Sequence, residues 1–284
     1  MIFADHELAC RLERPEAVAG ARFVEARRRL APDSNAEWAE VAGAYAMFDG
    51  PDSPITQTFG LGLFGDVGDA DLERLEEFFR DRGASVNHEV SPLAGVALFD
   101  RLCHRGYRPV EFTSVMYQPL PQTAATGSPA NPRLRTRVAQ SGDEDLWSEL
   151  SARGWSDQHP ELEEFLLGLG RVIAASEGAH AVIAELDGVP VAAGMLRCEG
   201  GVALFGGAST VPEARRQGAQ RALLEARMAI AMRARCDLAM MCAEPGSASQ
   251  RNAERQGFRI AYTRVKWHLD TGARQPPNGN DSER

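Results

Sequence analysis

The sequence has no long hydrophobic run and no cysteine pattern suited to a metal site or a disulfide framework. No apolar stretch is long enough to cross a bilayer, and the first residues, MIFADHELACRLERPE, lack the apolar core of a signal peptide. The five cysteines are an odd number and show neither CxxC nor Cys/His spacing. We therefore expect a cytoplasmic protein with reduced thiols, no membrane partner and no metal.

Positive charge is also scarce. The chain carries 31 Lys and Arg against 40 Asp and Glu, a net charge of −9, which argues against non-specific nucleic-acid binding. The deficit lies in residues 1–130, where 12 basic and 20 acidic side chains give −8, whereas 19 and 20 in residues 131–284 give −1. An anion-binding site therefore fits the second half better, because that half is less negative. A chain of 284 residues is long enough for two domains.

Two well-known phosphate-binding loops are missing. No Gly-Lys-Ser/Thr sequence is present, which excludes a P-loop. A dinucleotide fingerprint needs three spaced glycines and an acid at the end of the next strand, and the sequence offers only Gly218 in the relevant turn.

The stretch 200–224 (GGVALFGGASTVPEARRQGAQRALL) nevertheless predicts a phosphate site of another kind. An apolar strand over 202–211, interrupted by a Gly-Gly pair, runs through a proline and a short Arg/Gly turn into a helix. The first amides of that helix have no intrahelical partner, Gly218 leaves them open, and Arg215 and Arg216 add two guanidinium groups. An ordinary strand–helix turn with solvated arginines is the alternative.

Residues 1–120 predict a first domain. A helix over 5–30 should break at Pro15, and a second helical piece should carry Trp38 and Val41. The remaining expected elements are strands at 42–48 and 55–64, a helix at 69–82, a strand at 85–90, a helix at 96–105 and a strand at 107–117. Residues 121–132, rich in Pro, Ser, Thr and Gly, are interpreted as a linker.

Residues 133–270 predict a second domain with the same final order of elements. The expected elements are a strand at 134–138, helices at 143–153 and 160–175, strands at 180–185 and 189–197 joined at Asp187-Gly188, the stretch 200–224 with its helix to 235, a strand at 238–242, a helix at 249–256 and a strand at 258–269. Each domain has a glycine-bearing strand, a helix, a strand, a shorter helix ending in Gly, and a long strand, which we interpret as a duplication. Residues 271–284 are predicted to be a disordered tail.

With this element order, the second domain resembles the GCN5-related N-acetyltransferase (GNAT) family. The resemblance implies an α/β (α+β) fold of two tandem GNAT-like domains, each a mixed, mostly antiparallel sheet flanked by helices. The family's Arg/Gln-x-x-Gly-x-Gly/Ala loop binds the pyrophosphate of acetyl-CoA and matches residues 215–220, with Gln220 in place of the family's Gly or Ala. The implied cofactor residues are Ala208, Ser209 and Thr210 on the bulged strand, Arg215, Arg216, Gln217, Gly218, Ala219 and Gln220 in the loop, and Ser249 and Asn252 on the late helix.

The first domain resembles the same fold without the cofactor motif. Its strand leads into residues 65–71, which hold three aspartates and no arginine. Repulsion between these carboxylates and a diphosphate would outweigh the attraction of the helix terminus. We therefore expect a degenerate copy that binds no CoA.

The resemblance implies an acyl-CoA-dependent N-acyltransferase that moves an acetyl (acyl) group from acetyl-CoA to an amine of a small molecule or peptide, by direct transfer in a ternary complex. Glu244, just past a predicted strand, is our candidate base. Glu185 and Asp157 are alternatives, and a water relay would need no side-chain base. Tyr262 is the candidate acid, because Ala253 stands where the family often places a Tyr. Trp155 and Asp157, between the two early helices, are candidate acceptor contacts. Each of these residues also has a structural alternative. Glu244 could lie in a surface turn, Tyr262 could be a core residue, and Trp155 could serve packing alone.

A second function class fits the same residues. A non-catalytic CoA-binding sensor or scaffold would keep the cofactor loop and lose turnover, which would suit Ala253 and Gln220. Acyl transfer to a hydroxyl is also left open, and a homodimer is compatible with the sequence.

Overall fold

Strands from both halves of the chain build the fold. The computed structural model describes residues 2–121, 131–156 and 160–270. The predicted tail 271–284, nearly all of the predicted linker 121–132, and Asp157 lie outside the described residues.

The first half of the chain contributes three α-helices and five strands to its described part. In order they are α1 His6–Leu30, β1 Glu37–Val41, β2 Ala44–Phe48, β3 Gln57–Phe59, α2 Asp69–Arg80, β4 Val86–Val90, α3 Val96–His104 and β5 Arg108–Pro119.

The second half contributes four α-helices and six strands, counted over its described residues. In order they are β6 Leu134–Val138, α4 Glu144–Trp155, α5 Glu163–Ala174, β7 Ala179–Leu186, β8 Val189–Glu199, β9 Val202–Thr210, α6 Ala219–Arg233, β10 Leu238–Ala243, α7 Ala248–Arg255 and β11 Arg259–Leu269.

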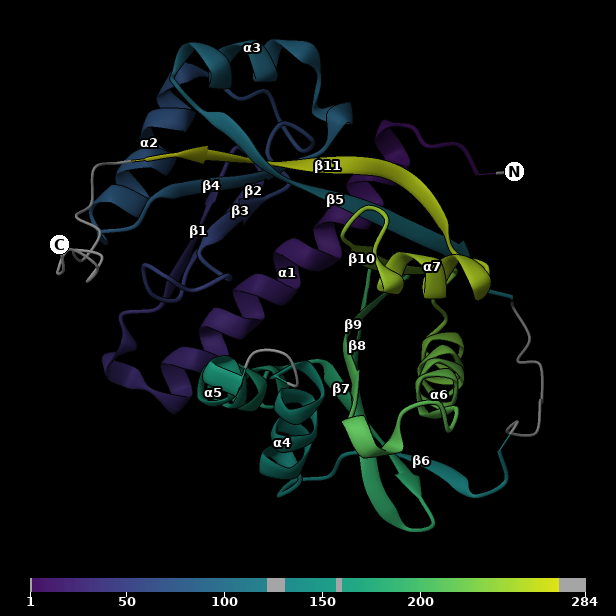
Figure 1. The fold of residues 1–284 in the computed structure, drawn as a ribbon. Helices are drawn as coiled ribbons and strands as arrows, with labels where there is room; N and C mark the ends of the chain where they lie inside the picture. Colours follow the sequence, from purple (N-terminus) through teal and green to yellow (C-terminus); the bar gives the residue numbers. More distant parts are fainter. Residues whose placement is uncertain (1, 122–130, 157–159, 271–284) are drawn as a thin grey trace, which may run out of the picture.

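All eleven strands join in one sheet, in the order β1-β2-β3-β4-β11-β5-β10-β9-β8-β7-β6. Neighbouring strands are antiparallel except at β3–β4 and β9–β10, which are parallel. The final strands of the two halves are exchanged: β11 inserts between β4 and β5, and β5 pairs with β10. In Figure 1 the yellow β11 lies among the blue strands of the first half. The fold is therefore the mixed, mostly antiparallel sheet flanked by helices that was expected, but the two halves share a single sheet.

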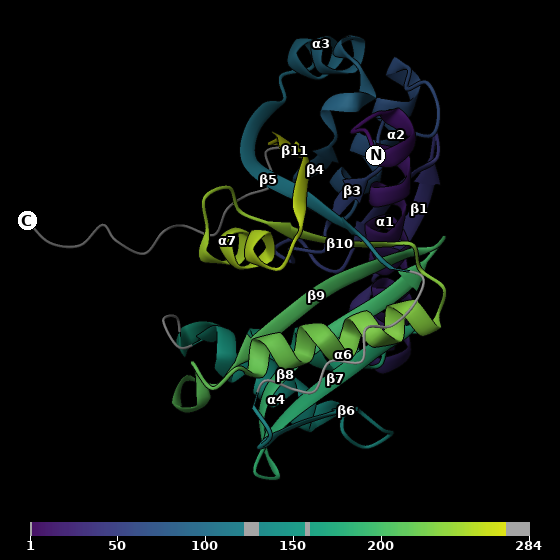
Figure 2. The same cartoon turned by 90° about the vertical axis from the view of Figure 1, so that its right-hand side faces the viewer.

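Helices cover both faces of this sheet. On one face α1 crosses the junction of the two halves and contacts β2, β8, β9 and α5. In Figure 2, α6 lies in front of β7, β8 and β9, while α4 lies behind them. Apolar side chains of α4 and α6 pack against these strands from opposite sides, with Trp147 of α4 and Leu223 of α6 fully buried.

Two predictions in the first half are wrong. The helix over 5–30 does not break, because α1 continues through Pro15. A mid-helix proline costs about 3 kcal/mol, and burial of a long helix face, including Leu12 and Val24, outweighs that cost. Trp38 lies in a strand and not in a helix, since β1 forms a hairpin with β2 in which Trp38 stacks on Tyr45 at 4.9 Å between ring centroids.

The strand predicted at 55–64 is also much shorter in the structure, where β3 spans only Gln57–Phe59. Gly60 and Gly62 follow with φ angles of +82° and +76°, a left-handed conformation that ends the strand. In the second half the predicted elements are confirmed to within a few residues, and Asp187-Gly188 forms the expected β7–β8 turn with φ angles of +51° and +80°.

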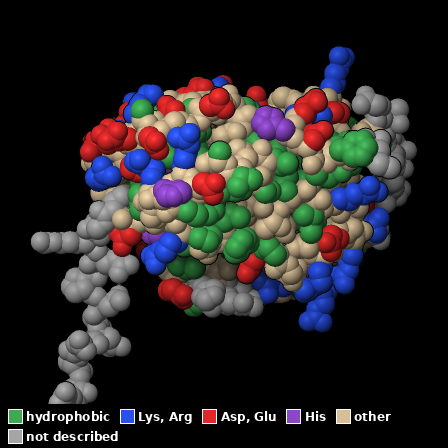
Figure 3. Space-filling model, turned by 90° about the horizontal axis from the view of Figure 1, so that it is seen from above, with side chains coloured by type: hydrophobic (Ala, Val, Ile, Leu, Met, Phe, Trp, Pro, Cys, Tyr) green, Lys and Arg blue, Asp and Glu red, His purple; other side chains and the backbone are tan. Residues whose placement is uncertain are grey.

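Apolar side chains gather on the surface seen from above, with charged groups around them (Figure 3). The exposed large apolar residues of the upper elements α3, β5 and β11 are Val96, Val110, Phe112 and Ile260. An apolar patch can mark a contact surface, and the homodimer considered from the sequence stays a prediction. No helix in the described ranges is both long and apolar enough to span a bilayer.

Candidate active site

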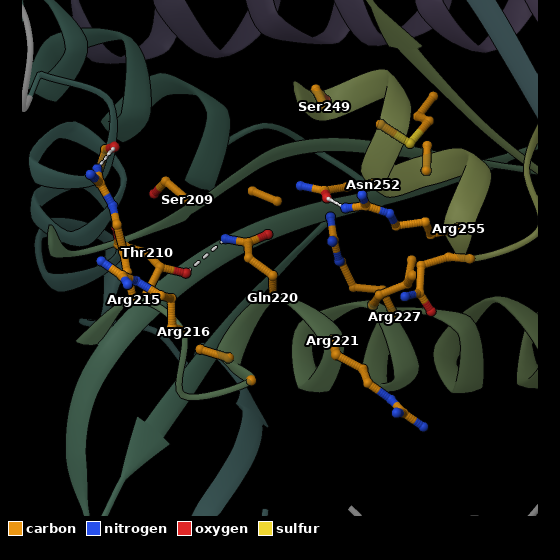
Figure 4. A pocket seen from close by; sticks show the side chains of 18 of the residues that line it. Ser209, Thr210, Arg215, Arg216, Gln220, Arg221, Arg227, Ser249, Asn252 and Arg255 are labelled. Atoms are coloured by element: carbon orange, nitrogen blue, oxygen red, sulfur yellow. Dashed lines mark hydrogen bonds between the residues drawn. The ribbon is translucent and has the colours of Figure 1, made fainter. Parts of the chain in front are cut away.

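A cleft opens where β9 and β10 separate. The two strands pair at only three positions, the last being Leu204 with Met240. Beyond this point β9 shifts register against residues 193–195 of β8, and Gly207 at the bulge has a φ of +58°. A cavity of about 620 Å³ lies here, bounded by β9, α6 and α7 (Figure 4). That volume is in the range of small-molecule and cofactor sites.

The turn before α6 presents the free amides of the helix to this cleft. Gly218 is the N-cap with a φ of +94°, and no side chain in the described part of the chain caps the helix. Arg216 also adopts a left-handed conformation, with a φ of +63°, which is uncommon for a side-chain-bearing residue. Asn131 Nδ2 donates to the Gln217 carbonyl at 3.0 Å and fixes the turn. The unpaired amides and the positive end of the helix dipole together favour an anion.

The charge of the cleft is of one sign. Of the described residues that line it, five are arginines and none is Asp or Glu. The arginines are Arg215, Arg216, Arg221, Arg227 and Arg255, labelled in Figure 4. A guanidinium group can donate two parallel hydrogen bonds to a phosphate group. An arginine-rich lining therefore favours a ligand with several negative charges.

Arg227 was not predicted from the sequence and is buried in the cleft lining, with 4% of its surface exposed. Its Nη1 donates to the carbonyls of Met195 at 3.1 Å and Gly206 at 3.3 Å, and its Nε donates to the Leu223 carbonyl at 3.1 Å. Burial lowers the pKa of this guanidinium to about 10. The side chain therefore ties α6 to β8 and β9 at the bulge.

Gln220, the departure from the family pattern, has a partner. Its Nε2 donates to Thr210 Oγ1 at 2.8 Å, which holds the side chain across the mouth of the cleft towards the end of β9 (Figure 4). A Gly or Ala at this position would leave that space open.

Gly154 at the end of α4 allows the helix to touch β9. A Cβ added there would lie 2.5 Å from Ser209 Cβ and 3.0 Å from the Thr210 nitrogen, so no side chain fits. Ser209 Oγ donates to the Leu150 carbonyl at 3.2 Å, and Arg215 Nη2 donates to the Gly154 carbonyl at 3.3 Å. These contacts fix α4, β9 and the loop as one unit.

The structure brings together most of the predicted cofactor residues. Those that line the cleft are Ala208, Ser209, Thr210, Arg215, Arg216, Gly218, Ala219, Gln220, Ser249 and Asn252. Gln217 is not among the described residues that line it, and its carbonyl accepts from Asn131. Trp155, a predicted acceptor contact, lines the same cleft and is 55% exposed.

The two predicted catalytic side chains lie elsewhere. Glu244 is exposed in the turn after β10 and is not among the described residues that line the cleft. Tyr262 is buried on the opposite face of the sheet, where its hydroxyl donates to Glu13 Oε1 at 2.9 Å. Burial, and after it the Glu13 carboxylate, raises the pKa of this phenol well above its ordinary value. A phenol that is buried away from the cleft and has a raised pKa does not fit the predicted role of acid. Tyr262 lies there because β11 inserts between β4 and β5 of the first half. The role of Glu244 stays a prediction.

Tyr262 belongs to a buried ionic cluster between α1 and the sheet. Arg264 of β11 donates to Glu13 Oε2 at 3.1 Å and to Glu89 Oε2 at 2.9 Å, and it also pairs with Glu16. The pKa of Glu13 is raised to about 7, mainly by burial. The neighbouring Glu16 and Glu89 carboxylates add to this effect. Across the described ranges, no group of three or more His, Cys, Asp or Glu side chains is arranged to hold a metal.

The corresponding position in the first half differs in charge and in capping. There β3 and β4 run parallel, as β9 and β10 do, and α2 follows the turn. Asp71 Oδ2 accepts from the Gly68 amide at 3.0 Å, so the start of α2 is closed by its own side chain.

Several lining residues were missed by the sequence analysis. They are Gly154, Ala214, Arg221, Leu224, Arg227, Met241, Ala253, Arg255, Gln256 and Phe258. Helical spacing could have indicated some of them, because positions 220, 224 and 227 share a face of α6, and 252, 255 and 256 share a face of α7. The contact of Gly154 in α4 with β9 joins distant segments, so no periodic pattern in the sequence indicates it.

Comparison with known proteins agrees with this geometry. Residues 143–258 match the acetyltransferase (GNAT) family. The fold is similar to that of a GCN5-related N-acetyltransferase from Kribbella flavida, with a TM-score of 0.61, 17% identity, and coverage of 89% of this chain and 96% of that chain. It is also similar to a tandem GNAT protein from the clavulanic acid biosynthesis pathway, with a TM-score of 0.59, 14% identity, and coverage of 97% and 98%. Among curated proteins none matches the sequence. Residues 143–258, which include every described residue that lines the cleft, form a domain of the acetyltransferase (GNAT) family.

Proposed function

We propose that the chain transfers an acetyl or other acyl group from acetyl-CoA to an amine of a small molecule or peptide, by direct transfer in a ternary complex. The observation that carries this proposal is the cleft at the β9–β10 separation, where free helix amides and an arginine-rich lining lie beside a bulged strand. A cytoplasmic location is part of the proposal, and the five cysteines are free thiols, as that compartment favours.

The residues present fit the parts of acetyl-CoA. The amides that follow Gly218, together with Arg215 and Arg216, would hold the diphosphate. The backbone of Ala208 to Thr210 would pair with the pantetheine arm, because β10 leaves that edge of β9 unpaired beyond Leu204. Ser249 and Asn252 of α7 add polar groups to the opposite wall.

When bound, acetyl-CoA supplies an acyl group already activated as a thioester. The chain's own contribution is orientation: Arg227 holds the bulge, and Gly154 lets α4 close against it. Glu244 remains our proposed base because it directly follows β10, on the strand that separates from the bulge.

The rival proposal is a CoA-binding sensor or scaffold without turnover. It is favoured by Ala253, which lines the cleft where the family often has a Tyr, and by the burial of Tyr262 on the other face. The two proposals differ in one measurement. A transferase releases free thiol from acetyl-CoA with at least one member of an amine panel, whereas a sensor gives heat on CoA titration and no thiol.

Removal of two guanidinium groups tests the cofactor site. Arg215→Ala with Arg216→Ala should weaken CoA binding by about 2–4 kcal/mol if both contact phosphate. Arg28→Ala with Arg233→Ala is the matched control, because both side chains are exposed and neither lines the cleft. Calorimetry that gives equal CoA affinity for the two double variants would contradict the proposal.

We infer further that the first half binds no CoA. Its helix α2 is capped by Asp71, and the turn before it carries aspartates and no arginine. Calorimetric titration of the full chain should therefore give one CoA per chain, and a stoichiometry of two would overturn this inference.

A further inference from the structure

A second cavity lies on the other face of the sheet, at the junction of the two halves. Its volume is about 190 Å³. It is lined by Glu16, Ala19, Gly20 and Phe23 of α1, by Met47, Ile55, Gln57 and Phe59 of the first half, and by Ile173, Ser176, Met195, Arg197 and Leu204 of the second half.

The cavity and the arginine-lined cleft lie on opposite sides of β9 at Gly206. On the cleft side, Arg227 donates to the Gly206 carbonyl at 3.3 Å. On the cavity side, the Met195 side chain packs against Gly206, and a Cβ added to that glycine would lie 3.3 Å from Met195 Cε. Because Gly206 has no side chain, Arg227 of the cleft and Met195 of the cavity both lie against its main chain here.

Strand β10 gives the same two-sided arrangement. Met241 lines the cleft, whereas its neighbour Cys242 points to the opposite face and donates its thiol proton to Glu16 Oε2 at 3.4 Å. Glu16 in turn lines the cavity. Strand β10 therefore borders the cleft through Met241 and contacts Glu16 of the cavity through Cys242.

The cavity combines apolar walls with one carboxylate and one guanidinium, those of Glu16 and Arg197. Most of its lining is aliphatic or aromatic, including Phe23, Ile55 and Phe59. The carboxylate of Glu16 is shared with Arg264 and keeps 14% of its side-chain surface exposed. An ionised carboxylate accepts about four hydrogen bonds, so Glu16 can take another donor.

Glu16 also belongs to a cluster that is rich in carboxylates. The carboxylates of Glu13, Glu16 and Glu89 surround the single guanidinium of Arg264. Lys266 contacts Glu89 at 3.3 Å but is shared with Glu111 at 2.5 Å. A ligand ammonium at Glu16 would add a charged hydrogen-bond donor to this cluster.

We propose that this cavity is the acceptor site, and that it takes a small primary amine with an apolar body, its ammonium group bound by Glu16. The inference rests on the proposed transferase function and names the substrate class for it. The apolar body packs between α1 and α5, so both halves of the chain form the site. The nitrogen then lies on the side of β9 and β10 opposite the cofactor cleft, at the point where these strands separate.

Size restricts the acceptor. A protein cavity of about 150 Å³ binds benzene, so a cavity of about 190 Å³ holds one ring or a short branched chain with an amine. At the Arg197 end, a second polar contact is available. Arg197 is 5% exposed and its Nε has no partner within the described part of the chain, while Nη2 donates to Ser176 Oγ at 2.8 Å. A hydroxyl or carbonyl on the acceptor could accept from that Nε.

The test measures amine binding separately from CoA binding, on the full chain. Calorimetry with CoA present at saturation would compare phenethylamine and 3-methylbutylamine with the polar triamine spermidine. We expect the two apolar amines to bind at least tenfold more tightly than spermidine. Glu16→Gln, which removes the charge, and Ala19→Phe, which fills the cavity, should each weaken phenethylamine at least tenfold. Glu7→Gln, on the exposed first turn of α1, is the matched control.

Each outcome decides a different statement. CoA affinity that is kept in Glu16→Gln and Ala19→Phe establishes that both variants are folded, so a loss of amine binding in them supports the acceptor site. Amine binding unchanged in both variants, or spermidine preferred to the apolar amines, would overturn the inference and leave the proposed function standing. A wild-type chain that binds no CoA would instead overturn the proposed function.

Discussion

Glu13 makes the stability of this protein depend on pH in a direction opposite to that of most carboxylates. The side chain is fully buried, and its two oxygens accept from the Tyr262 hydroxyl at 2.9 Å and from Arg264 Nη1 at 3.1 Å. Burial raises its pKa from an ordinary 4.5 to about 7. Between these values the folded chain binds more protons than the unfolded chain, so the free energy of unfolding falls as pH rises through this window.

The size of the effect follows from the shift in pKa. A shift from 4.5 to about 7 corresponds to about 3 kcal/mol lost between pH 4.5 and pH 8. Glu13→Gln removes the titration and preserves the contacts, because an amide oxygen can accept from Arg264 and an amide nitrogen can donate to the Tyr262 oxygen. The variant should therefore gain about 3 kcal/mol over the wild type as pH rises across the window.

Urea unfolding of both proteins at pH 5, 6, 7 and 8 measures this difference. The exposed Glu7→Gln variant serves as control and should follow the wild type at every pH. If the free energies of Glu13→Gln and the wild type run parallel from pH 5 to 8, Glu13 is ionised throughout and the reasoning fails.

Three further changes probe the cleft. Gly154→Ala should abolish CoA binding or weaken it more than tenfold, because the added methyl group meets the backbone of β9, and unaltered affinity in calorimetry would refute that contact. Gln220→Ala should tighten CoA binding severalfold, since the wild-type side chain lies across the cleft mouth on Thr210; weaker binding would mean that this amide contacts the ligand. Arg227→Met should lower the free energy of unfolding by about 1.5–3 kcal/mol, measured in urea, through loss of charged hydrogen bonds to carbonyls at the bulge; equal stability would show that the brace is dispensable.

Local signals in the sequence predicted the second half well. The Asp187-Gly188 turn, the glycines of β9 and the Arg/Gly turn before α6 each act within a few residues, and most of the predicted cofactor residues line the cleft. Prediction failed where distant packing decides the outcome. Burial of α1 carries it through Pro15, and stacking on Tyr45 holds Trp38 in a strand.

The candidate catalytic residues show the same limit. Tyr262 was placed by its order along the chain, which cannot reveal that β11 crosses into the other half's sheet. The Glu16 cavity was also invisible in the sequence, because its walls come from segments more than 150 residues apart, such as Glu16 and Ile173. No periodic pattern connects positions so far apart.

The reciprocal insertion of β5 and β11 joins the two halves of this single chain as an exchange of strands would join two subunits of a dimer. In a pair of separate chains, an exchange of this kind would make the melting temperature rise with protein concentration. Here the covalent connection between the halves removes that dependence, and dilution leaves the partners together. A single proteolytic cut between residues 121 and 131 should restore it, and the two fragments should then unfold at a temperature set by how much of each is present.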